Sequence, residues 1–316
     1  MSRIIDGKLV AKKIKDQIKN WIKEDLCYPP TLAILTFGND DASKVYVKNK
    51  IKAAEEVGSD ADHYIFLQDE YNEKDFEDRI WEIVDSHDGT ILQLPVPSWC
   101  DADRILKLIP AGKDVDGLTE CQMGMLRTKP LEALHPCTPQ GIMELIYEYK
   151  SELPERAKTA LVIGRSNLVG RPMAEMLLQD DFTVTIAHSK TPKDELLRAF
   201  ANADLVVSAA GKKDLITEED ALQFWKDNRH YFPDSFEFKK DRMIIDVSIN
   251  RDENGKLCGD FSEEFKQKYS KCYTPVPGGV GPMTVAVLMY NTYLAALDRD
   301  WDWDLIKKRK RKELTE

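Results

Sequence analysis

Cysteine is scarce in the sequence, and its spacing excludes the commonest metal motifs. None of the six cysteines forms a CxxC pair, and none of the five histidines stands at zinc-finger spacing from them. A disulfide scaffold is not expected in a chain of 316 residues, because such scaffolds serve small secreted domains. We therefore interpret the cysteines as buried, reduced thiols and predict that no metal is bound.

Long apolar runs and clusters of basic residues are missing as well. No run of about 18 apolar residues is present, so we expect no membrane span, and the charged N-terminus differs from a secretory signal. With 45 basic against 55 acidic side chains the net charge is −10, which disfavours binding to nucleic acid or a membrane surface. The basic tail at 307–313 is interpreted as a solvated chain end, with a nucleic-acid or membrane role as the alternative. These absences predict a soluble cytoplasmic protein.

Helix and strand patterns alternate along two stretches of the chain. The first stretch predicts helices at 6–24, 41–57 and 73–86 and strands at 31–37, 63–67 and 89–94. The apolar positions of the first helix are Leu9, Val10, Ile14, Ile18 and Ile22. The second stretch, from Lys158 onward, predicts strands at 159–163, 182–187, 204–209 and 243–249. Such alternation predicts an α/β protein with mainly parallel sheets.

The length of the chain favours two domains over one. A polar stretch at 149–157 is the candidate linker, and a helix at 139–149 is expected to lead into it. A third region, 283–297, has the apolar character of a helix. We expect this helix to return to the first domain.

A glycine-containing loop follows the first strand of the second stretch. The segment 164–172 (GRSNLVGRP) comes directly after strand 159–163 and opens a helix. Glycines at Gly164 and Gly170 would let the backbone approach a pyrophosphate, and the helix N-terminus would supply N–H groups. Because the spacing differs from GxGxxG, a tight turn without a ligand is the alternative.

The next strand discriminates between two nicotinamide cofactors. NAD-binding folds place an Asp or Glu here to accept the ribose hydroxyls. Strand 182–187 is instead followed by His188, Ser189, Lys190 and Thr191, and Arg165 lies in the preceding glycine loop. Hydroxyls and cations suit a 2′-phosphate, so these residues favour NADP over NAD. The alternative is that Arg165 and Lys190 are merely solvated.

The first stretch carries polar residues that suit a site. Tyr46 and Lys50 stand at i and i+4 on one helix face, although an ordinary basic surface would explain them equally. Gln93 ends a strand and is followed by Leu94 and two prolines, at the edge where α/β sheets place ligands. Asp116 precedes a glycine, which a simple turn would also explain. The loop 274–284 is too elaborate for a mere connector.

Six motifs give the chain a specific resemblance. They are YVKNK (46–50), QLPVP (93–97), KDVDG (113–117), PCTP (136–139), GRSNLVGRP (164–172) and PVPGGVGPMT (275–284). Occurring in this order over nearly the whole chain, they resemble the methylenetetrahydrofolate dehydrogenase/cyclohydrolase family. The resemblance implies a catalytic folate-binding α/β domain (1–146 and 283–316) and a Rossmann-like NADP-binding domain (147–282). It also implies a homodimer.

The resemblance assigns roles to the residues of these motifs. Lys50 would be the catalytic lysine, Gln93 would hold it, Tyr46 would pack against the folate ring system, and Asp116 would hydrogen-bond the pterin. The further residues implied to line the folate cleft are Leu94, Gly278, Gly279 and Pro282. Those implied to hold the cofactor are Gly164, Arg165, Ser166, Gly170, Ser189 and Ile249.

The implied activity has two steps. The enzyme would oxidise 5,10-methylenetetrahydrofolate with NADP+ and then hydrolyse the product to 10-formyltetrahydrofolate, with Lys50 moving protons in the second step. The alternatives are a dehydrogenase alone, using NADP or NAD, and a non-catalytic folate- or nucleotide-binding protein. Intact Tyr46, Lys50, Gln93 and Asp116 disfavour the non-catalytic alternative.

The sequence departs from the family at three places. Ser248 stands where the family usually has glycine, beside the expected cofactor site, and Ser59 replaces another glycine at a helix end. The stretch 213–241 is longer than in the family and rich in aromatic residues. We interpret this stretch as a packed surface excursion, with dimer contacts or cofactor choice as the alternative.

Overall fold

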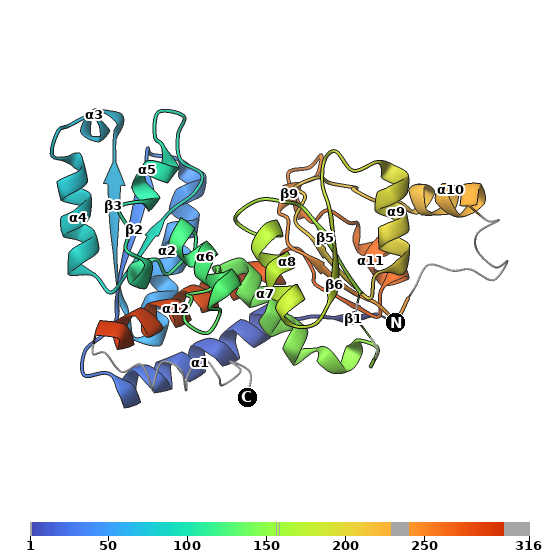
Figure 1. Cartoon of the computed structure of the whole chain (residues 1–316), viewed down its shortest axis with the longest axis horizontal. Helices are drawn as coiled ribbons and strands as arrows, with labels where there is room; N and C mark the ends of the chain where they lie inside the picture. Colours follow the sequence, from blue (N-terminus) through green and yellow to red (C-terminus); the bar gives the residue numbers. More distant parts are fainter. Residues whose placement is uncertain (1, 156, 158, 229–239, 300–316) are drawn as a thin grey trace. The chain divides into compact units, whose positions relative to one another are not determined.

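Two separate parallel sheets organise the chain in the computed structural model, which describes residues 2–155, 157, 159–228 and 240–299 (Figure 1). The chain divides into two compact units around these sheets. One contains Ala11–Gln140 and the described residues from Thr284 onward, and we call it the three-stranded unit. The other contains the residues up to Val10 and Gly141–Met283, and we call it the six-stranded unit. The α/β fold predicted from the sequence is confirmed.

The three-stranded sheet has the order β3-β2-β4, with all strands parallel. Its strands are β2 (Thr31–Phe37), β3 (Asp60–Phe66) and β4 (Gly89–Leu92). The central strand β2 is buried over all but its first residue, as expected for a parallel strand covered on both faces. Its helices are α2 (Asp41–Val57), α3 (Gln68–Tyr71), α4 (Phe76–Ser86), α5 (Ala102–Leu106), η1 (Ala111–Lys113) and α6 (Glu120–Thr128).

The hydrophobic core of this unit forms where the odd-numbered side chains of β2 meet α4. Leu35 and Phe37 pack with Phe76, Ile80 and Val84. Helix α4 lies on one side of the strands and α2 on the other (Figure 1). Sequence patterns predicted one helix over 73–86, whereas α3 and α4 are separate, and strand β3 begins three residues before the predicted position.

Three helices cross the boundary between the units along the chain. They are α1 (Gly7–Asp25), α7 (Cys137–Glu148) and α12 (Val280–Arg299). Val10, Ile14, Ile18 and Ile22 of α1 are buried, but Leu9 is 51% exposed because it lies one residue off that i, i+4 stripe. The helix predicted at 6–24 is confirmed as α1.

The apolar helix predicted at 283–297 is present as α12. Its stretch Val280–Leu297 is long and apolar enough to cross a membrane by length and composition alone, and 78% of this stretch is buried inside the protein. The apolar residues of this stretch are not an uninterrupted run, because Gly, Pro, Thr and Asn interrupt them. Burial of this extent is typical of a core helix. In the three-stranded unit, the ring of Tyr293 stacks on that of Trp21, with centroids 5.9 Å apart.

The six-stranded sheet has the order β1-β11-β8-β7-β5-β6, and every pairing in it is parallel. Its strands are β1 (Arg3–Ile4), β5 (Thr159–Ile163), β6 (Thr183–Ala187), β7 (Leu205–Ser208), β8 (Met243–Asp246) and β11 (Cys272–Tyr273). The chain runs from β5 outward to β6 and then crosses back to β7 and β8. The strand order therefore reverses beside β5, and open α/β sheets bind ligands at the carboxyl ends of the strands at such a point.

Helices cover both faces of this sheet (Figure 1). They are α8 (Gly170–Gln179), α9 (Lys193–Asn202), α10 (Glu218–Asn228) and α11 (Glu263–Tyr269). A turn of 3-10 helix, η2 (Lys150–Glu152), precedes β5, and a hairpin of β9 (Asn250–Arg251) and β10 (Leu257–Cys258) follows β8. Part of the aromatic stretch 213–241 is described: Phe224 lies in the core, whereas the aromatic residues at 231, 232, 236 and 238 lie outside the described residues, as does the basic tail.

Candidate functional site

Lys50 and Gln93 are in direct contact within the three-stranded unit. The Lys50 ammonium donates a hydrogen bond of 2.9 Å to Oε1 of Gln93. The Gln93 amide nitrogen donates to the carbonyl of Leu94 at 2.7 Å, which fixes the orientation of the side chain. Helix α2 carries the lysine, and the end of β4 carries the glutamine, whose N–H bonds the carbonyl of Leu35. The amide oxygen therefore faces the ammonium group in a set geometry.

Tyr46 lies one helical turn before Lys50 on α2 and is 49% exposed. An exposed ring one turn from an anchored lysine offers a flat apolar surface to a planar ligand. Leu94 continues the segment that Gln93 begins, and the peptide bond between Leu94 and Pro95 is cis. Four of the sequence-predicted folate residues thus lie on α2 or directly after β4.

The loop that carries Asp116 is held by the preceding aspartate. Asp114 is 1% exposed, and its carboxylate accepts hydrogen bonds from the N–H groups of Gly117 at 3.0 Å and Thr119 at 2.7 Å. Burial raises the pKa of Asp114 to about 6. Gly117 has φ +70, and a Cβ there would lie 2.6 Å from the backbone nitrogen of Pro136. Asp116 itself is half-buried in this fixed turn.

A buried thiol connects Asp116 with Lys50. The Cys137 thiol is 2% exposed and donates to the carbonyl of Val115 at 3.2 Å. Burial raises its pKa, the negative charge and hydrogen bond of Asp116 add to that effect, and the positive charge of Lys50 opposes it. The lysine and the aspartate therefore both lie within electrostatic reach of one sulfur atom. Cys137 was predicted only as a buried thiol, and its position in this cluster was missed.

A second residue missed from the sequence supports the same cluster from α12. The Asn291 amide donates to the carbonyls of Val115 and His135, both at 2.9 Å, and lies 3.7 Å from the Cys137 sulfur. Asn291 is 2% exposed. One buried amide therefore ties the Asp116 loop to the start of α7. No local pattern around Asn291 indicates this role, because its partners are far away in the sequence.

The phosphate loop of the six-stranded unit depends on backbone geometry. Gly164 has φ +132, and a Cβ there would lie 2.6 Å from the carbonyl oxygen of Ala209. A Cβ on Gly170, the first residue of α8, would lie 2.3 Å from the Gly164 oxygen. The two glycines therefore create a close turn ahead of a helix N-terminus, which is a cradle for a phosphate group. Arg165 and Ser166 are exposed in it.

The segment after β6 lies beside this loop because β6 is paired with β5. Ser189 and Lys190 are exposed there, in a turn closed by the N–H of His188 on the Thr191 hydroxyl at 2.9 Å. Residues 188–191 include no carboxylate. The residues present fit the 2′-phosphate of NADP, as the sequence predicted. Ile249, after β8, is 50% exposed.

The loop before α12 is anchored by glycines as well. Gly278 has φ +109, and Gly279 is so close to Gly7 that a Cβ on Gly7 would lie 1.8 Å from the Gly279 oxygen. Pro282 is half-buried at the start of α12. These three predicted folate residues belong to the six-stranded unit, while Lys50, Gln93 and the other predicted folate residues belong to the three-stranded unit. Within the described residues, no group of three or more His, Cys, Asp or Glu side chains is arranged to hold a metal ion.

Two family models match the chain. The model of the tetrahydrofolate dehydrogenase/cyclohydrolase catalytic domain matches residues 5–116, and that of its NAD(P)-binding domain matches 136–223 and 232–300. The chain is 39% identical over 307 residues to the bifunctional protein FolD of Streptococcus thermophilus, across 94% of this chain and 98% of that protein.

Solved structures resemble the chain over the same extent. The bifunctional methylenetetrahydrofolate dehydrogenase/cyclohydrolase FolD of Campylobacter jejuni is 35% identical, with a TM-score of 0.81, over 95% of this chain and all of that one (100%). The Trypanosoma brucei FolD, solved with NADP cofactor and an inhibitor, is 28% identical, with a TM-score of 0.79, over 95% of this chain and 99% of that one.

Proposed function

The chain belongs to the tetrahydrofolate dehydrogenase/cyclohydrolase family, and from this premise we propose which of its residues serve each of the two reactions. The protein oxidises 5,10-methylenetetrahydrofolate to 5,10-methenyltetrahydrofolate with NADP+ and hydrolyses that product to 10-formyltetrahydrofolate, in one-carbon metabolism. The observation that carries our proposal is the 2.9 Å hydrogen bond from Lys50 to Gln93.

The oxidation requires positioning more than proton transfer. NADP+ supplies the acceptor for the hydride that leaves the bridging methylene, and the folate becomes a delocalised amidinium cation. Arg165, Ser166 and Ser189 hold the 2′-phosphate, while the turn between Gly164 and Gly170 admits the pyrophosphate to the N-terminus of α8. In the proposal these residues orient the cofactor, and no side chain gives or takes a proton.

The folate is held by the residues of the three-stranded unit. The Tyr46 ring stacks on the planar ring system of the folate, and the Asp116 carboxylate accepts hydrogen bonds from the pterin. Leu94 lines the same surface beside Gln93.

The hydrolysis requires proton transfer, which we assign to Lys50. Water adds to the amidinium carbon while the lysine amine accepts one proton from it. The ring then opens as the carbon–N5 bond breaks and N5 receives a proton, and the hydroxyl proton of the adduct leaves to solvent as the formyl C=O bond forms. Gln93 keeps the lysine in place through its amide oxygen. The protonated lysine then returns its proton to N5, so one residue serves both halves of the step.

Product analysis tests the pair of activities. Purified protein would receive 5,10-methylenetetrahydrofolate with NADP+, and separately with NAD+, and the reduced cofactor and the one-carbon products would be quantified against a control without enzyme. We expect NADPH together with enzyme-dependent 10-formyltetrahydrofolate. Methenyltetrahydrofolate that decays only at the control rate would leave a dehydrogenase alone, and a preference for NAD+ would contradict the proposed phosphate contacts.

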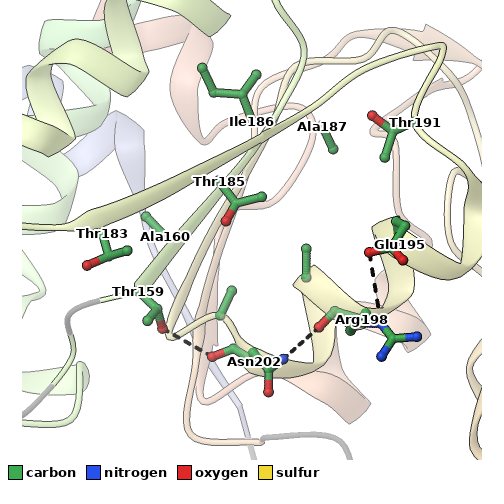
Figure 2. Close-up of a pocket in the computed structure, with 12 residues that line it drawn as sticks. Thr159, Ala160, Thr183, Thr185, Ile186, Ala187, Thr191, Glu195, Arg198 and Asn202 are labelled. Atoms are coloured by element: carbon green, nitrogen blue, oxygen red, sulfur yellow. Dashed lines mark hydrogen bonds and ion pairs between the residues drawn. The ribbon is translucent and has the colours of Figure 1, made fainter. Parts of the chain in front are cut away.

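We also propose that the protein is a homodimer that pairs through β6. This strand is at the edge of the six-stranded sheet, and within the described residues it pairs only with β5. Ile186 is 44% exposed, and a hollow beside the strand is lined by Thr185 together with Glu195 and Arg198 of α9 (Figure 2). An exposed β-branched edge strand is a template for pairing with another strand.

Light scattering on the purified protein tests the dimer. Ile186→Lys should convert a dimer to a monomer, because the substitution places a charge on the proposed interface. Leu222→Lys is the matched control, since Leu222 of α10 is 48% exposed on another element. A wild-type monomer, or a dimer unaffected by Ile186→Lys, would contradict the proposed interface.

A further inference from the structure

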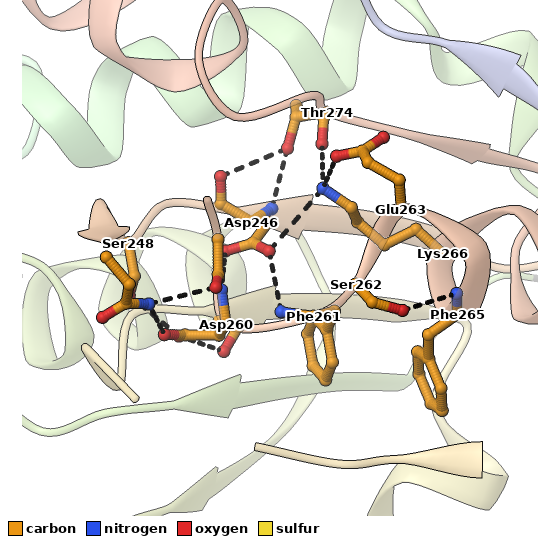
Figure 3. Close-up of polar contacts among 12 residues, drawn as sticks. Asp246, Ser248, Asp260, Phe261, Ser262, Glu263, Phe265, Lys266 and Thr274 are labelled. Atoms are coloured by element: carbon orange, nitrogen blue, oxygen red, sulfur yellow. Dashed lines mark hydrogen bonds and ion pairs between the residues drawn. The ribbon is translucent and has the colours of Figure 1, made fainter. Parts of the chain in front are cut away.

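A fully buried carboxylate lies beneath the carboxyl ends of β7 and β8 (Figure 3). Asp260 is 0% exposed and accepts five hydrogen bonds. Three come from side chains: Ser208 at 2.7 Å, Ser248 at 2.8 Å and Asn250 at 3.0 Å. Two come from the backbone N–H groups of Ala210 at 2.9 Å and Lys212 at 2.8 Å. Sequence analysis gave Asp260 no role.

The five donors belong to two segments that follow β7 and β8, at the carboxyl ends of the strands where the cofactor is expected to bind. Ser208 ends β7 and the segment 209–212 follows it, while Ser248 lies in the loop after β8 and Asn250 begins β9. The first loop reaches the phosphate loop, because the ideal Cβ of Gly164 lies 2.6 Å from the Ala209 oxygen. One carboxylate therefore fixes two loops that follow adjacent strands.

A second carboxylate holds Asp260 in place. Asp246, the last residue of β8, accepts hydrogen bonds from the N–H groups of Asp260 at 3.0 Å and Phe261 at 3.1 Å. Gly259 permits this approach, since a Cβ there would lie 2.0 Å from the Asp246 carboxylate. Lys266 is also fully buried, and its ammonium lies 3.8 Å from Asp246 (Figure 3). The turn that carries Asp260 is thus tied to the strand end.

Ser248 links this network to the loop after β7. Its hydroxyl donates to Asp260 and accepts a hydrogen bond of 2.9 Å from the N–H of Gly211. Gly211 has φ +63, a left-handed conformation that costs glycine little. Glycine at position 248, the residue usual in the family, has no hydroxyl and would leave both bonds unmade.

The two loops lie on the side of the crevice that faces away from the 2′-phosphate site. Ser189 and Lys190 follow β6, on one side of β5, whereas β7 and β8 lie on the other side. A dinucleotide spans the crevice at such a switch point, so the residues at the ends of β7 and β8 would hold the half of NADP+ that carries the nicotinamide. Ile249 stands there between Ser248 and Asn250, both bonded to Asp260, and is 50% exposed.

We propose that Ser248 is a positioning residue for the nicotinamide, acting through its bridge between Asp260 and Gly211; the proposal rests on the proposed NADP-dependent activity. The bridge restrains the segment 209–212 and the backbone around Ile249, and hydride transfer depends on how well such contacts orient the nicotinamide. The hydroxyl thereby supplies a restraint that a glycine at this position lacks.

Ser248→Ala tests the proposal, because it removes the hydroxyl and keeps the Cβ. We expect kcat of the NADP+-dependent dehydrogenase to fall about tenfold, as the loop after β7 loses one restraint. The KM for the folate should be unchanged. The hydrolysis of added methenyltetrahydrofolate, which needs no cofactor, should proceed at the wild-type rate in the same preparation.

Thr159→Val is the matched control for a purely structural effect. The Thr159 hydroxyl bonds the Asp204 carboxylate at 2.7 Å at the opposite end of the same sheet. This variant should lower the melting temperature and leave the dehydrogenase kcat unchanged.

Two outcomes would overturn the inference. In one, Ser248→Ala keeps the wild-type dehydrogenase kcat; in the other, it loses dehydrogenase and cyclohydrolase activity in equal proportion. A wild-type protein that forms no NADPH would instead overturn the proposed function, so the two failures are distinguishable.

Discussion

The two units organise their sites by different means. In the three-stranded unit, side chains contact one another: Lys50 bonds Gln93, and the thiol of Cys137 lies within reach of Lys50 and Asp116. In the six-stranded unit, the side chains expected to contact the cofactor, such as Arg165, are exposed, and the shape of the site comes from the backbone. Chemistry therefore depends on side-chain placement in one unit, and binding depends on loop geometry in the other.

This difference has a simple physical origin. Proton transfer needs a base within hydrogen-bond reach of the reacting atom, so the base must be oriented by a neighbour. Phosphate binding needs N–H groups at a helix N-terminus and a backbone that approaches closely, which only glycine permits at tight positions. Substitutions in the two units should therefore affect different activities.

The largest effect is expected from Gly170→Ala in the phosphate loop. The new Cβ would lie 2.3 Å from the Gly164 oxygen, so the loop must move. We expect kcat/KM for NADP+ to fall about 100-fold, equivalent to about 2.7 kcal/mol, while methenyltetrahydrofolate hydrolysis is retained. Gly124→Ala in α6 is the control, since its Cβ meets no atom within 4 Å. Equal loss of both activities would contradict the separation of the units' roles.

Gln93→Ala breaks the side-chain contact of the other unit. Lys50 loses the acceptor at 2.9 Å that orients it, and hydrogen bonds to charged groups contribute about 1.5–3 kcal/mol. We expect cyclohydrolase kcat to fall about 10- to 100-fold, with a smaller change in the NADP+-dependent oxidation. Stopped assays of each step would measure both values. A dehydrogenase loss larger than the cyclohydrolase loss would refute the role of Gln93.

Arg165→Ala removes an exposed charge near the proposed 2′-phosphate. Since the site is open to solvent and salt screens the charge, we expect KM for NADP+ to rise about tenfold. The KM for NAD+, which lacks this phosphate, should stay the same. Initial rates with both cofactors measure the ratio. Arg127→Ala, at an exposed arginine of α6, is the control, and an equal rise for both cofactors would argue against a phosphate contact.

A smaller effect is expected from two buried carboxyl groups, one in each unit, which make the free energy of unfolding depend on pH. Burial raises the folded-state pKa of Asp114 and of Asp246 to about 6. Each folded-state pKa exceeds the ordinary value of 3.8, so the folded protein holds protons that the unfolded chain releases between pH 4 and 6. These groups therefore lower the free energy of unfolding as pH rises through that window, by at most about 1.4 kcal/mol per pH unit each.

Asp114→Asn isolates this contribution. Denaturant titrations at several pH values between pH 4 and 6 should show a more positive slope of unfolding free energy with pH in the variant than in the wild type. Asp75→Asn, in a residue that precedes α4, is the control. Identical slopes in the wild type and Asp114→Asn would show that the buried carboxyl does not titrate in that window.

The sequence predicted the alternating elements because parallel strands and amphipathic helices have strong local patterns. It missed β1, a pair of residues whose strand character comes only from pairing with β11 at the other end of the chain. The long strand predicted at 243–249 ends at Asp246, and the side chains of Ser248 and Asn250 beyond it bond Asp260. Elements that depend on distant partners cannot be read from local periodicity.

The same limit applies to the site. Sequence motifs predicted Lys50, Gln93 and the phosphate loop as site residues. Gln93 and the phosphate loop directly follow strands, where α/β sheets place ligands. Asn291 and Asp260 were missed because nothing in their local sequence distinguishes them from an ordinary helix asparagine and an ordinary turn aspartate. Each is buried against a loop that is distant in the sequence, and its hydrogen bonds to that loop define its role. The supporting residues were therefore identified only from the structure, whereas the residues proposed to contact ligands were recognised from the sequence.

Lys50→Met tests the central claim most directly, that one lysine in the three-stranded unit carries the hydrolysis. Both steps would be measured in the same preparation, with Lys48→Met, an exposed lysine of the same helix, as control. The account predicts that methenyltetrahydrofolate hydrolysis falls to the uncatalysed rate while NADP+-dependent oxidation persists, and that the control keeps both. Hydrolysis near the wild-type rate in Lys50→Met would contradict it.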